Sequence, residues 1–347
     1  MDKLKENVNH KAFSIGKMIL DKYSSVIVLL VMIILASLIS DAFFTSSNIL
    51  NVLRQVAANG ILSIGLLMVI ITGGIDISIG SVVGITSVLF AALYDPESAV
   101  GPFQGLVRIL SKLVPGGGAG LVIAILILMI FGGIWGLFNG IVICKAKVQP
   151  FIMTIGTLTL YRGVALLISN GKPIYMSSET AEKVQFLGDG RIIFGIPTQV
   201  LVLVIVGLIM AFLLNRTIFG RYIKAIGGNQ ESARVAGINV DKYKTWAYIL
   251  CGVLASVSGI ILTARTTTGD PTLGESFEMN AIAACVIGGA KLTGGVGTIG
   301  GTIIGAIIIG IINNILNLAN ISTYYQYVVR GGIIILAVVF NSMERKK

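Results

Sequence analysis

Residues 52–94 read VLRQVAANGILSIGLLMVIITGGIDISIGSVVGITSVLFAALY, which is two apolar runs separated by a glycine pair and one aspartate. Each run has about the length that a helix needs to cross a hydrocarbon layer ~30 Å thick. The pattern therefore predicts two membrane-spanning helices, over residues 52–73 and 77–94, with a break between them. A charged side chain within a membrane is energetically costly, so we expect Asp76 to have a structural or functional role.

The rest of the chain repeats this apolar pattern. Of its 347 residues 55% are hydrophobic and 12% are charged, and the mean hydropathy is +0.91, which is more apolar surface than one soluble core of this length hides. The apolar runs do not alternate with polar residues, which argues against a membrane β-barrel. We therefore predict an all-α polytopic membrane protein with about ten transmembrane helices, near residues 24–40, 52–73, 77–94, 120–144, 151–169, 198–214, 245–264, 279–290, 297–318 and 324–340.

The charged residues between the spans predict how the protein lies in the membrane. Cytoplasmic segments carry an excess of Lys and Arg, and this rule assigns the N-terminal tail (1–23), the segment 216–244 and the C-terminal tail (342–347) to the cytoplasm. Residues 24–341 then form a single transmembrane domain. We expect both termini to be cytoplasmic. The net charge of +10 is dispersed over these segments, so it gives no indication of a nucleic-acid partner.

Residues that support catalysis or metal binding are scarce. The one histidine, His10, lies in the N-terminal tail, and Cys144, Cys251 and Cys285 have no paired spacing. Residues 295–300 match the pattern G-x-G-x-x-G, but the match opens an apolar span where a dinucleotide fold would need a preceding strand. We therefore expect no catalytic residues, no cofactor and no metal site, and if ATP drives this protein, another subunit binds it.

The basic segment 216–244 contains a second distinctive pattern. Asn229 is a suitable N-cap, and Gly237 is a suitable end, for a short helix between them. A positively charged cytoplasmic loop would explain the charges but not the capped helix. Such a helix, held between two spans, is suited to inserting into a groove of a partner protein.

Four separated blocks carry a resemblance to a known family. They are ITGGIDISIG (71–80), VQPFIMTIGTLTLYRG (148–163), FGRYIKAIGGNQESARVAGI (219–238) and FEMNAIAACVIGGAKLTGGVGTIGGT (277–302). In this order they resemble the permease subunit of bacterial ABC importers for ribose, galactose and related monosaccharides, over about residues 48–341. The resemblance implies a transport subunit that is not an enzyme, and it implies three partners: cytoplasmic ATPase subunits, an extracytoplasmic sugar-binding protein and a second permease copy, identical or a close paralogue.

The resemblance also implies a role for the short cytoplasmic helix. In that family this loop couples the permease to the ATPase, which carries over to Glu231, Ser232, Ala233 and Gly237. The chain departs from the wider importer pattern in its central serine and in having no Leu-Pro after the glycine. We add the cap and the neighbouring base, so the predicted ATPase-coupling residues are Asn229, Glu231, Ser232, Ala233, Arg234 and Gly237. The alternative function is a stand-alone secondary carrier or facilitator, which would not need this helix.

Two readings of Asp76 remain open at this point. It can lie at a broken helix near the sugar path, or it can cap the start of the third span. Polar residues within the spans are the candidates for the translocation path: Thr72, Asp76, Ser78, Asn139, Arg162 and Asn313. Helix breaks are predicted at Gly73, Gly74, Gly288 and Gly289. The similar contexts of Arg162 and Arg330, five spans apart, suggest an internal repeat of two five-helix halves, whereas the two glycine pairs, six spans apart, suggest a parallel repeat.

Overall fold

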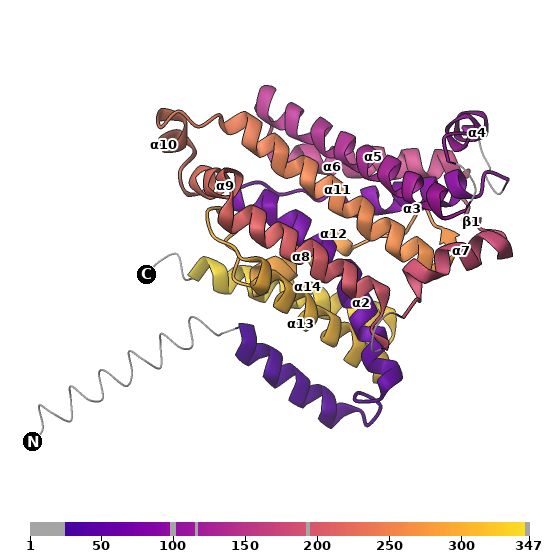
Figure 1. Cartoon of the computed structure of the whole chain (residues 1–347). Coiled ribbons are helices and arrows are strands. Elements are labelled where there is room, and N and C mark those ends of the chain that lie inside the picture. Colours follow the sequence, from indigo (N-terminus) through magenta and orange to yellow (C-terminus); the bar gives the residue numbers. More distant parts are fainter. Residues whose placement is uncertain (1–24, 98–101, 115–116, 192–194, 344–347) are drawn as a thin grey trace, which may run out of the picture.

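The computed structural model describes residues 25–97, 102–114, 117–191 and 195–343 (Figure 1), so the predicted N-terminal tail and the basic end of the C-terminal tail lie outside them. An N-terminal helix over Ser25–Ile39 precedes the labelled helices. These are α2 (Ser46–Ile71), α3 (Ile79–Tyr94), α4 (Gln104–Ser111), α5 (Gly118–Lys145), α6 (Pro150–Ser169), α7 (Ser178–Gly188), α8 (Thr198–Arg216), α9 (Ile218–Gly228), α10 (Gln230–Val235), α11 (Val240–Thr266), α12 (Phe277–Ile287), α13 (Ile299–Leu318) and α14 (Thr323–Met343). Two short strands, β1 (Ile174–Tyr175) and β2 (Thr268–Gly269), pair antiparallel, so the described chain is helical apart from this ribbon.

Among the described helices, six are long and apolar enough to cross a membrane: α2, α5, α6, α8, α11 and α13. Three of the ten predicted spans correspond instead to shorter apolar helices of 10–17 residues, which are Ser25–Ile39, α3 and α12, and the tenth corresponds to α14. The shortfall at α3 and α12 has a physical reason. The chain leads into or out of these helices through non-helical segments, and extended backbone advances about 3.3 Å per residue against 1.5 Å in a helix.

Capping residues move several boundaries from their predicted positions. Helix α2 begins at Ser46 rather than residue 52, because the Thr45 hydroxyl accepts the N–H of Asn48 at 3.4 Å. Helix α11 begins at Val240 rather than residue 245, because the Asn239 side chain accepts the N–H of Lys242 at 3.0 Å. Polar cap residues lie outside an apolar run, so hydropathy alone starts both helices too late.

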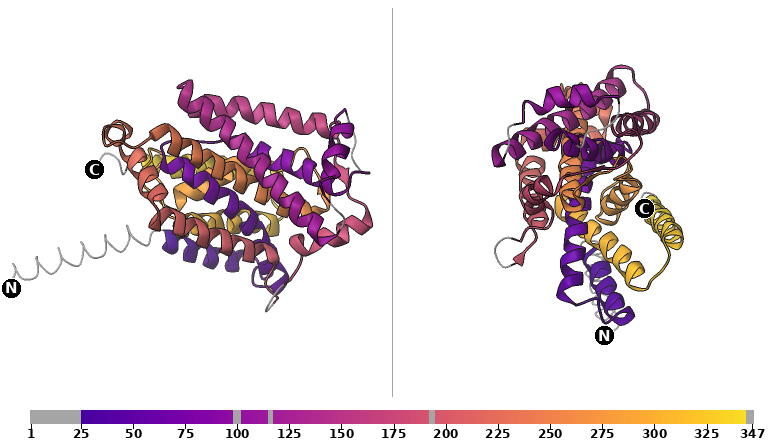
Figure 2. Two further views of the ribbon diagram at one scale, coloured as in Figure 1. Left: turned by 45° about the horizontal axis from the view of Figure 1, so that its top comes forward. Right: turned by 90° about the vertical axis from the view of Figure 1, so that its right-hand side faces the viewer.

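Helix α2 is the central element of the bundle. It packs against α8, α11, α12 and α13 (Figures 1 and 2), and 83% of its apolar window is buried within the protein, against 28% for α5 and for α6. A helix that is apolar all round is typical of such a position. The outward faces of α5, α6 and α8 carry exposed leucine, isoleucine and phenylalanine side chains, as expected of surfaces that meet lipid.

Two helix breaks share one backbone geometry. Gly73 (φ +76°) follows α2 and Gly289 (φ +85°) follows α12, and both have the left-handed backbone that glycine adopts without steric cost. The N–H of the next residue then donates back to the helix, from Gly74 to the carbonyl of Val69 at 3.2 Å and from Ala290 to that of Cys285 at 2.9 Å. In the sequence the pair Gly73-Gly74 resembles the pair Gly288-Gly289. In the structure Gly73, the first residue of its pair, corresponds to Gly289, the second residue of the other pair.

The two ends of the bundle differ. Helices α9 and α10 lie at the left of Figure 1, together with the start of the N-terminal helix and the end of α14. Helices α4 and α7 and the strand β1 lie at the right. The two described chain ends therefore lie on the same side of the bundle as the segment that the sequence predicts to be cytoplasmic.

Candidate functional site

The predicted short helix is present as α10, and both of its predicted end residues act as expected. The Asn229 side chain accepts the N–H of Ser232 at 2.9 Å at the N-terminus. At the other end Gly237 has φ +83° and donates its N–H to the carbonyl of Arg234 at 3.0 Å. Ala233 is 5% exposed and packs with Ile226 of α9, so α10 is fixed to the neighbouring helix by an apolar contact.

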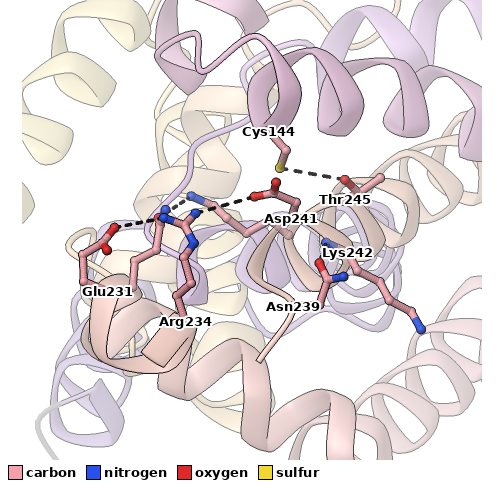
Figure 3. A network of polar contacts seen from close by, with 9 residues as sticks. Cys144, Glu231, Arg234, Asn239, Asp241, Lys242 and Thr245 are labelled. Atoms are coloured by element: carbon pink, nitrogen blue, oxygen red, sulfur yellow. Dashed lines mark hydrogen bonds and ion pairs between the residues drawn. The ribbon is translucent and has the colours of Figure 1, made fainter. Parts of the chain in front are cut away.

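Polar contacts fix α10 to the start of α11 (Figure 3). Arg234 lies 3.1 Å from Glu231 and 3.9 Å from Asp241, and Lys244 of α11 donates to the side chain of Gln230 at 3.2 Å. Exposed pairs of this kind contribute little stability. These contacts orient α10 relative to α11, and the apolar contact of Ala233 with Ile226 places it against α9.

The outer surface of α10 presents side chains that no described residue covers. The Glu231 and Arg234 side chains are 77% and 51% exposed, and Val235 is 88% exposed. Val235 is not among the predicted coupling residues, because an apolar residue at the end of a short helix has no distinguishing pattern in the sequence. Val235 therefore adds an exposed apolar side chain next to Arg234, and arginine is one of the residue types enriched at the centres of protein contacts.

The end of α9, directly before α10, touches the end of α2 and the segment that follows the second helix break. The N–H of Gly295, in the segment between α12 and α13, donates to the carbonyl of Ile71 at the end of α2 at 2.8 Å. Gly227 of α9 lies against this pair so closely that a Cβ added to it would overlap the Ile71 oxygen and the Gly295 nitrogen. Three segments far apart in the sequence thus meet backbone to backbone, two residues before the N-cap of α10.

Asp76 lies in a buried hydrogen-bond network. It is 2% exposed, and its carboxylate accepts the N–H of Ser78 at 3.0 Å and the Ser78 hydroxyl at 2.6 Å. Asn139 of α5 donates to the Ser78 hydroxyl at 2.9 Å and to the Asp76 carboxylate at 3.5 Å, and Tyr161 of α6 donates to the Asn139 carbonyl oxygen at 3.3 Å. This arrangement joins the entry to α3 to two neighbouring helices. The N-cap residue of α3 is Ser78, whose own N–H Asp76 accepts, and no described side chain caps the first turn of the helix, so Asp76 does not cap α3 directly.

Two further predicted path residues make backbone contacts. The Thr72 hydroxyl donates to the carbonyl of Val69 at 2.7 Å, within its own helix. Arg162 donates to the carbonyls of Pro271, Leu273 at 3.1 Å and Gly80 at 3.3 Å, so it holds the segment before α12 against the start of α3. Its partners are carbonyls rather than the Asp76 carboxylate.

A separate cavity of about 280 Å³ lies between α2, α11, α12 and α13. Its polar lining consists of side-chain carboxamides and one guanidinium, with a phenylalanine ring beside them, from Gln55, Asn59, Arg265, Phe277, Asn280, Asn313 and Asn317. Asn313 is the one predicted path residue that lines it. Thr72, Asp76, Ser78, Asn139 and Arg162 lie elsewhere, so the structure does not bring the predicted path residues together at this cavity.

Carboxamides in apolar helices point to this cavity in the sequence, but residue type alone does not predict which of them line it. Carboxamides are uncommon inside apolar helices, and Asn59 and Asn313 both lie in such runs. Others pair with protein groups instead: Asn48 and Asn314 exchange hydrogen bonds at 3.0 and 2.7 Å. Only the packing of the helices shows which amides face a cavity.

Comparison with known proteins identifies relatives over nearly the whole chain. The profile of a family described as "Branched-chain amino acid transport system / permease component" matches residues 48–338. The ribose import permease protein RbsC of Escherichia coli (strain K12) is 40% identical over 322 residues, which cover 92% of this chain and 94% of the relative. RbsC of Bacillus subtilis (strain 168) is 40% identical over 329 residues, covering 95% and 94%.

A relative named for another sugar shows the same coverage. The D-allose transport system permease protein AlsC of Escherichia coli (strain K12) is 35% identical over 327 residues, covering 94% of this chain and 93% of the relative. No solved structure matches the chain.

Proposed function

Because the chain belongs to the family of branched-chain amino acid transport system permease components, we propose that it is the membrane-spanning permease subunit of an ATP-driven monosaccharide importer. The observation that carries this proposal is the 40% identity to a ribose import permease over 92% of the chain. In this function the protein is a transport subunit, and ATP is hydrolysed by separate subunits. The sugar is delivered by an extracytoplasmic binding protein and released into the cytoplasm.

Helix α10 is the proposed ATPase-coupling element. Its support is the exposed surface of Glu231, Arg234 and Val235 on a rigidly held helix, at the end of the bundle where both described chain ends lie. That end then faces the cytoplasm. Docking of an ATPase on α10 moves α9 and α11 together, because α10 is bonded to both.

The finer architecture belongs to the same proposal. The chain crosses a bacterial plasma membrane about ten times, with α3 and α12 completing their crossings through extended segments. A second copy or a close paralogue pairs with it in the membrane. The shared geometry of the two helix breaks supports a repeat that relates the region of α2 to that of α12.

Uptake measurements test the proposal directly. Deletion of the chain is expected to abolish ATP-dependent uptake of labelled ribose, allose or a related monosaccharide, and expression of the intact chain restores it. The double substitution Glu231→Ala with Arg234→Ala is expected to weaken ATPase association and uptake. The matched control is Glu179→Ala with Lys183→Ala, an exposed ion pair at 2.6 Å on α7 at the opposite end of the bundle.

The alternative function makes the opposite prediction. A stand-alone carrier would retain uptake after ATP depletion, and the α10 double variant would behave as the α7 control does. The relatives described above are named as permeases of import or transport systems, which favours the importer.

A further inference from the structure

The chemistry of the cavity between α2, α11, α12 and α13 is unusual for the interior of a membrane protein. Five carboxamides from three helices converge on about 280 Å³ beside the ring of Phe277. Each carboxamide offers both N–H donors and a carbonyl acceptor. Polar side chains within membrane helices normally bond to one another or mark a substrate path.

One of these carboxamides has an acceptor that is left over. Among the described residues, none hydrogen bonds to the buried Oδ1 of Asn59, although its backbone carbonyl accepts the Ser63 hydroxyl at 2.7 Å. A buried acceptor without a donor costs about 1–3 kcal/mol. This oxygen has almost no accessible surface, so a ligand hydroxyl reaches it, and removes that cost, once the Asn59 side chain turns toward the cavity.

The residues that line the cavity also limit the charge of the ligand that it can bind. Among the described residues that line the cavity, Arg265 is the only charged one, and its guanidinium donates to the side chain of Asn51 at 2.8 Å. No carboxylate is present there to bind a cation. Apart from Arg265, the polar lining groups are neutral donors and acceptors beside an apolar ring, which match a molecule with many hydroxyls on a carbon skeleton.

The size of the cavity also limits the size of the ligand. About 280 Å³ lies just below the ~300–1,000 Å³ of common small-molecule pockets, which admits one sugar ring rather than an oligosaccharide. We propose that this cavity binds a single neutral monosaccharide in transit and that the Asn59 carboxamide accepts one of its hydroxyls. This inference rests on the proposed function, because it assigns the substrate of the importer to one place in the bundle.

The first test measures transport by the complete importer, reconstituted with its ATPase and with saturating sugar-loaded binding protein. Asn59→Ala is expected to lower the sugar moved per ATP about three- to tenfold, the effect of one hydrogen bond between neutral groups. The control is Asn48→Ala, which removes the same side chain from the same helix outside the cavity. Transport by Asn59→Ala that equals wild type, or an equal loss in the control, overturns the inference.

The second test detects binding without relying on transport. In a chain whose three cysteines are replaced by serine, Gln55→Cys is labelled by a small thiol reagent in the presence of ribose, allose or ribose 5-phosphate. A neutral sugar is expected to slow labelling of Gln55→Cys but not of Leu53→Cys, on the same helix outside the cavity. Protection by the phosphate alone, or by none of the three, contradicts the inference.

The two tests also separate the inference from the proposed function. If the wild-type complex moves no sugar, the proposed function fails, and the labelling experiment still decides whether the cavity binds one. If the wild-type complex moves sugar while Asn59→Ala and the labelling show no effect, only the cavity assignment fails.

Discussion

Gly227→Ala would place a methyl group in the contact that joins the end of α9 to the end of α2, at the first helix break, and to the segment that follows the second break. The added Cβ overlaps the Ile71 oxygen and the Gly295 nitrogen, and it lies 3.0 Å from the carbonyl carbon of Gly294. These neighbours are backbone atoms, so no side chain can rotate away. The end of α9 and the breaks must separate to restore an ordinary contact of about 3.5 Å, which needs a shift on the order of 1 Å.

The structure also sets the magnitude of the effect. Overpacking of a tight contact typically costs about 1–3 kcal/mol, which corresponds to roughly 5- to 150-fold in the equilibrium between the joined and the separated arrangement. We expect the separated arrangement to transmit movement of α10 to α2 poorly. Sugar transported per ATP hydrolysed should therefore fall at least fivefold, while the subunits still associate, because the exposed surface of α10 is unchanged.

The neighbouring glycine provides the control. A Cβ on Gly228 has no atom within 4 Å, and both glycines lie in the last turn of α9, so both substitutions gain the same helix propensity of about 1 kcal/mol. The assay is simultaneous measurement of ATP hydrolysis and sugar uptake by the reconstituted complex. If Gly227→Ala keeps the wild-type ratio of sugar to ATP, or if Gly228→Ala loses it equally, the contact does not transmit the movement.

Three further substitutions test other parts of the structure. Val235→Asp should leave the melting temperature unchanged, since the Val235 side chain is 88% exposed. It should weaken ATPase binding in a pull-down at least tenfold. Unchanged binding would show that Val235 is not part of the interface. Asp76→Ala should lower the free energy of unfolding of the permease in detergent by about 1–3 kcal/mol, because the buried N–H of Ser78 loses its acceptor. Asp76→Asn keeps that acceptor and should retain uptake. An inactive but stable Asp76→Asn variant would show that the charge is needed. Gly136→Ala should lower the melting temperature by several degrees, because its Cβ overlaps the backbone of α11. The Cβ of Gly133→Ala meets only side-chain methyl groups at 3.3 Å or more, so this control should lower it less. Equal shifts of the melting temperature would argue against a close contact between α5 and α11.

The membrane helices and the cap of α10 follow from local patterns, and the sequence predicts them well. Apolar runs identify each of the six long helices, with starts up to six residues too late, and Asn229 and Gly237 identify both ends of α10. The glycine pair beside Asp76 correctly indicates that the chain leaves its helix there. Each of these features depends on residues that are near one another in the chain.

The features that the sequence did not predict depend on contacts between distant segments. The partner of Asp76 on α5 is Asn139, 63 residues away, and nothing in the local pattern selects it over Arg162. Likewise, Asn59 and Asn48 are both asparagines on α2, yet Asn59 lines the cavity and Asn48 pairs with Asn314. Both asparagines face α13, so the difference depends on whether a carboxamide of α13 lies within hydrogen-bond distance, and hydropathy does not contain that information.

The central position of α2 has a consequence for the synthesis of the protein. Helix α2 is among the first to be made, whereas α11, which packs along it, begins roughly 170 residues after α2 ends. At about 5–20 residues per second, the ribosome needs on the order of 10 to 30 s to reach α11. During that interval α8 and the other helices made before α11 can pack beside α2, but α11, α12 and α13, which line the cavity with Gln55 and Asn59, are still missing. Helix α2 must therefore tolerate a provisional environment before its permanent neighbours arrive, and its high apolar content serves that early stage as well as the finished bundle.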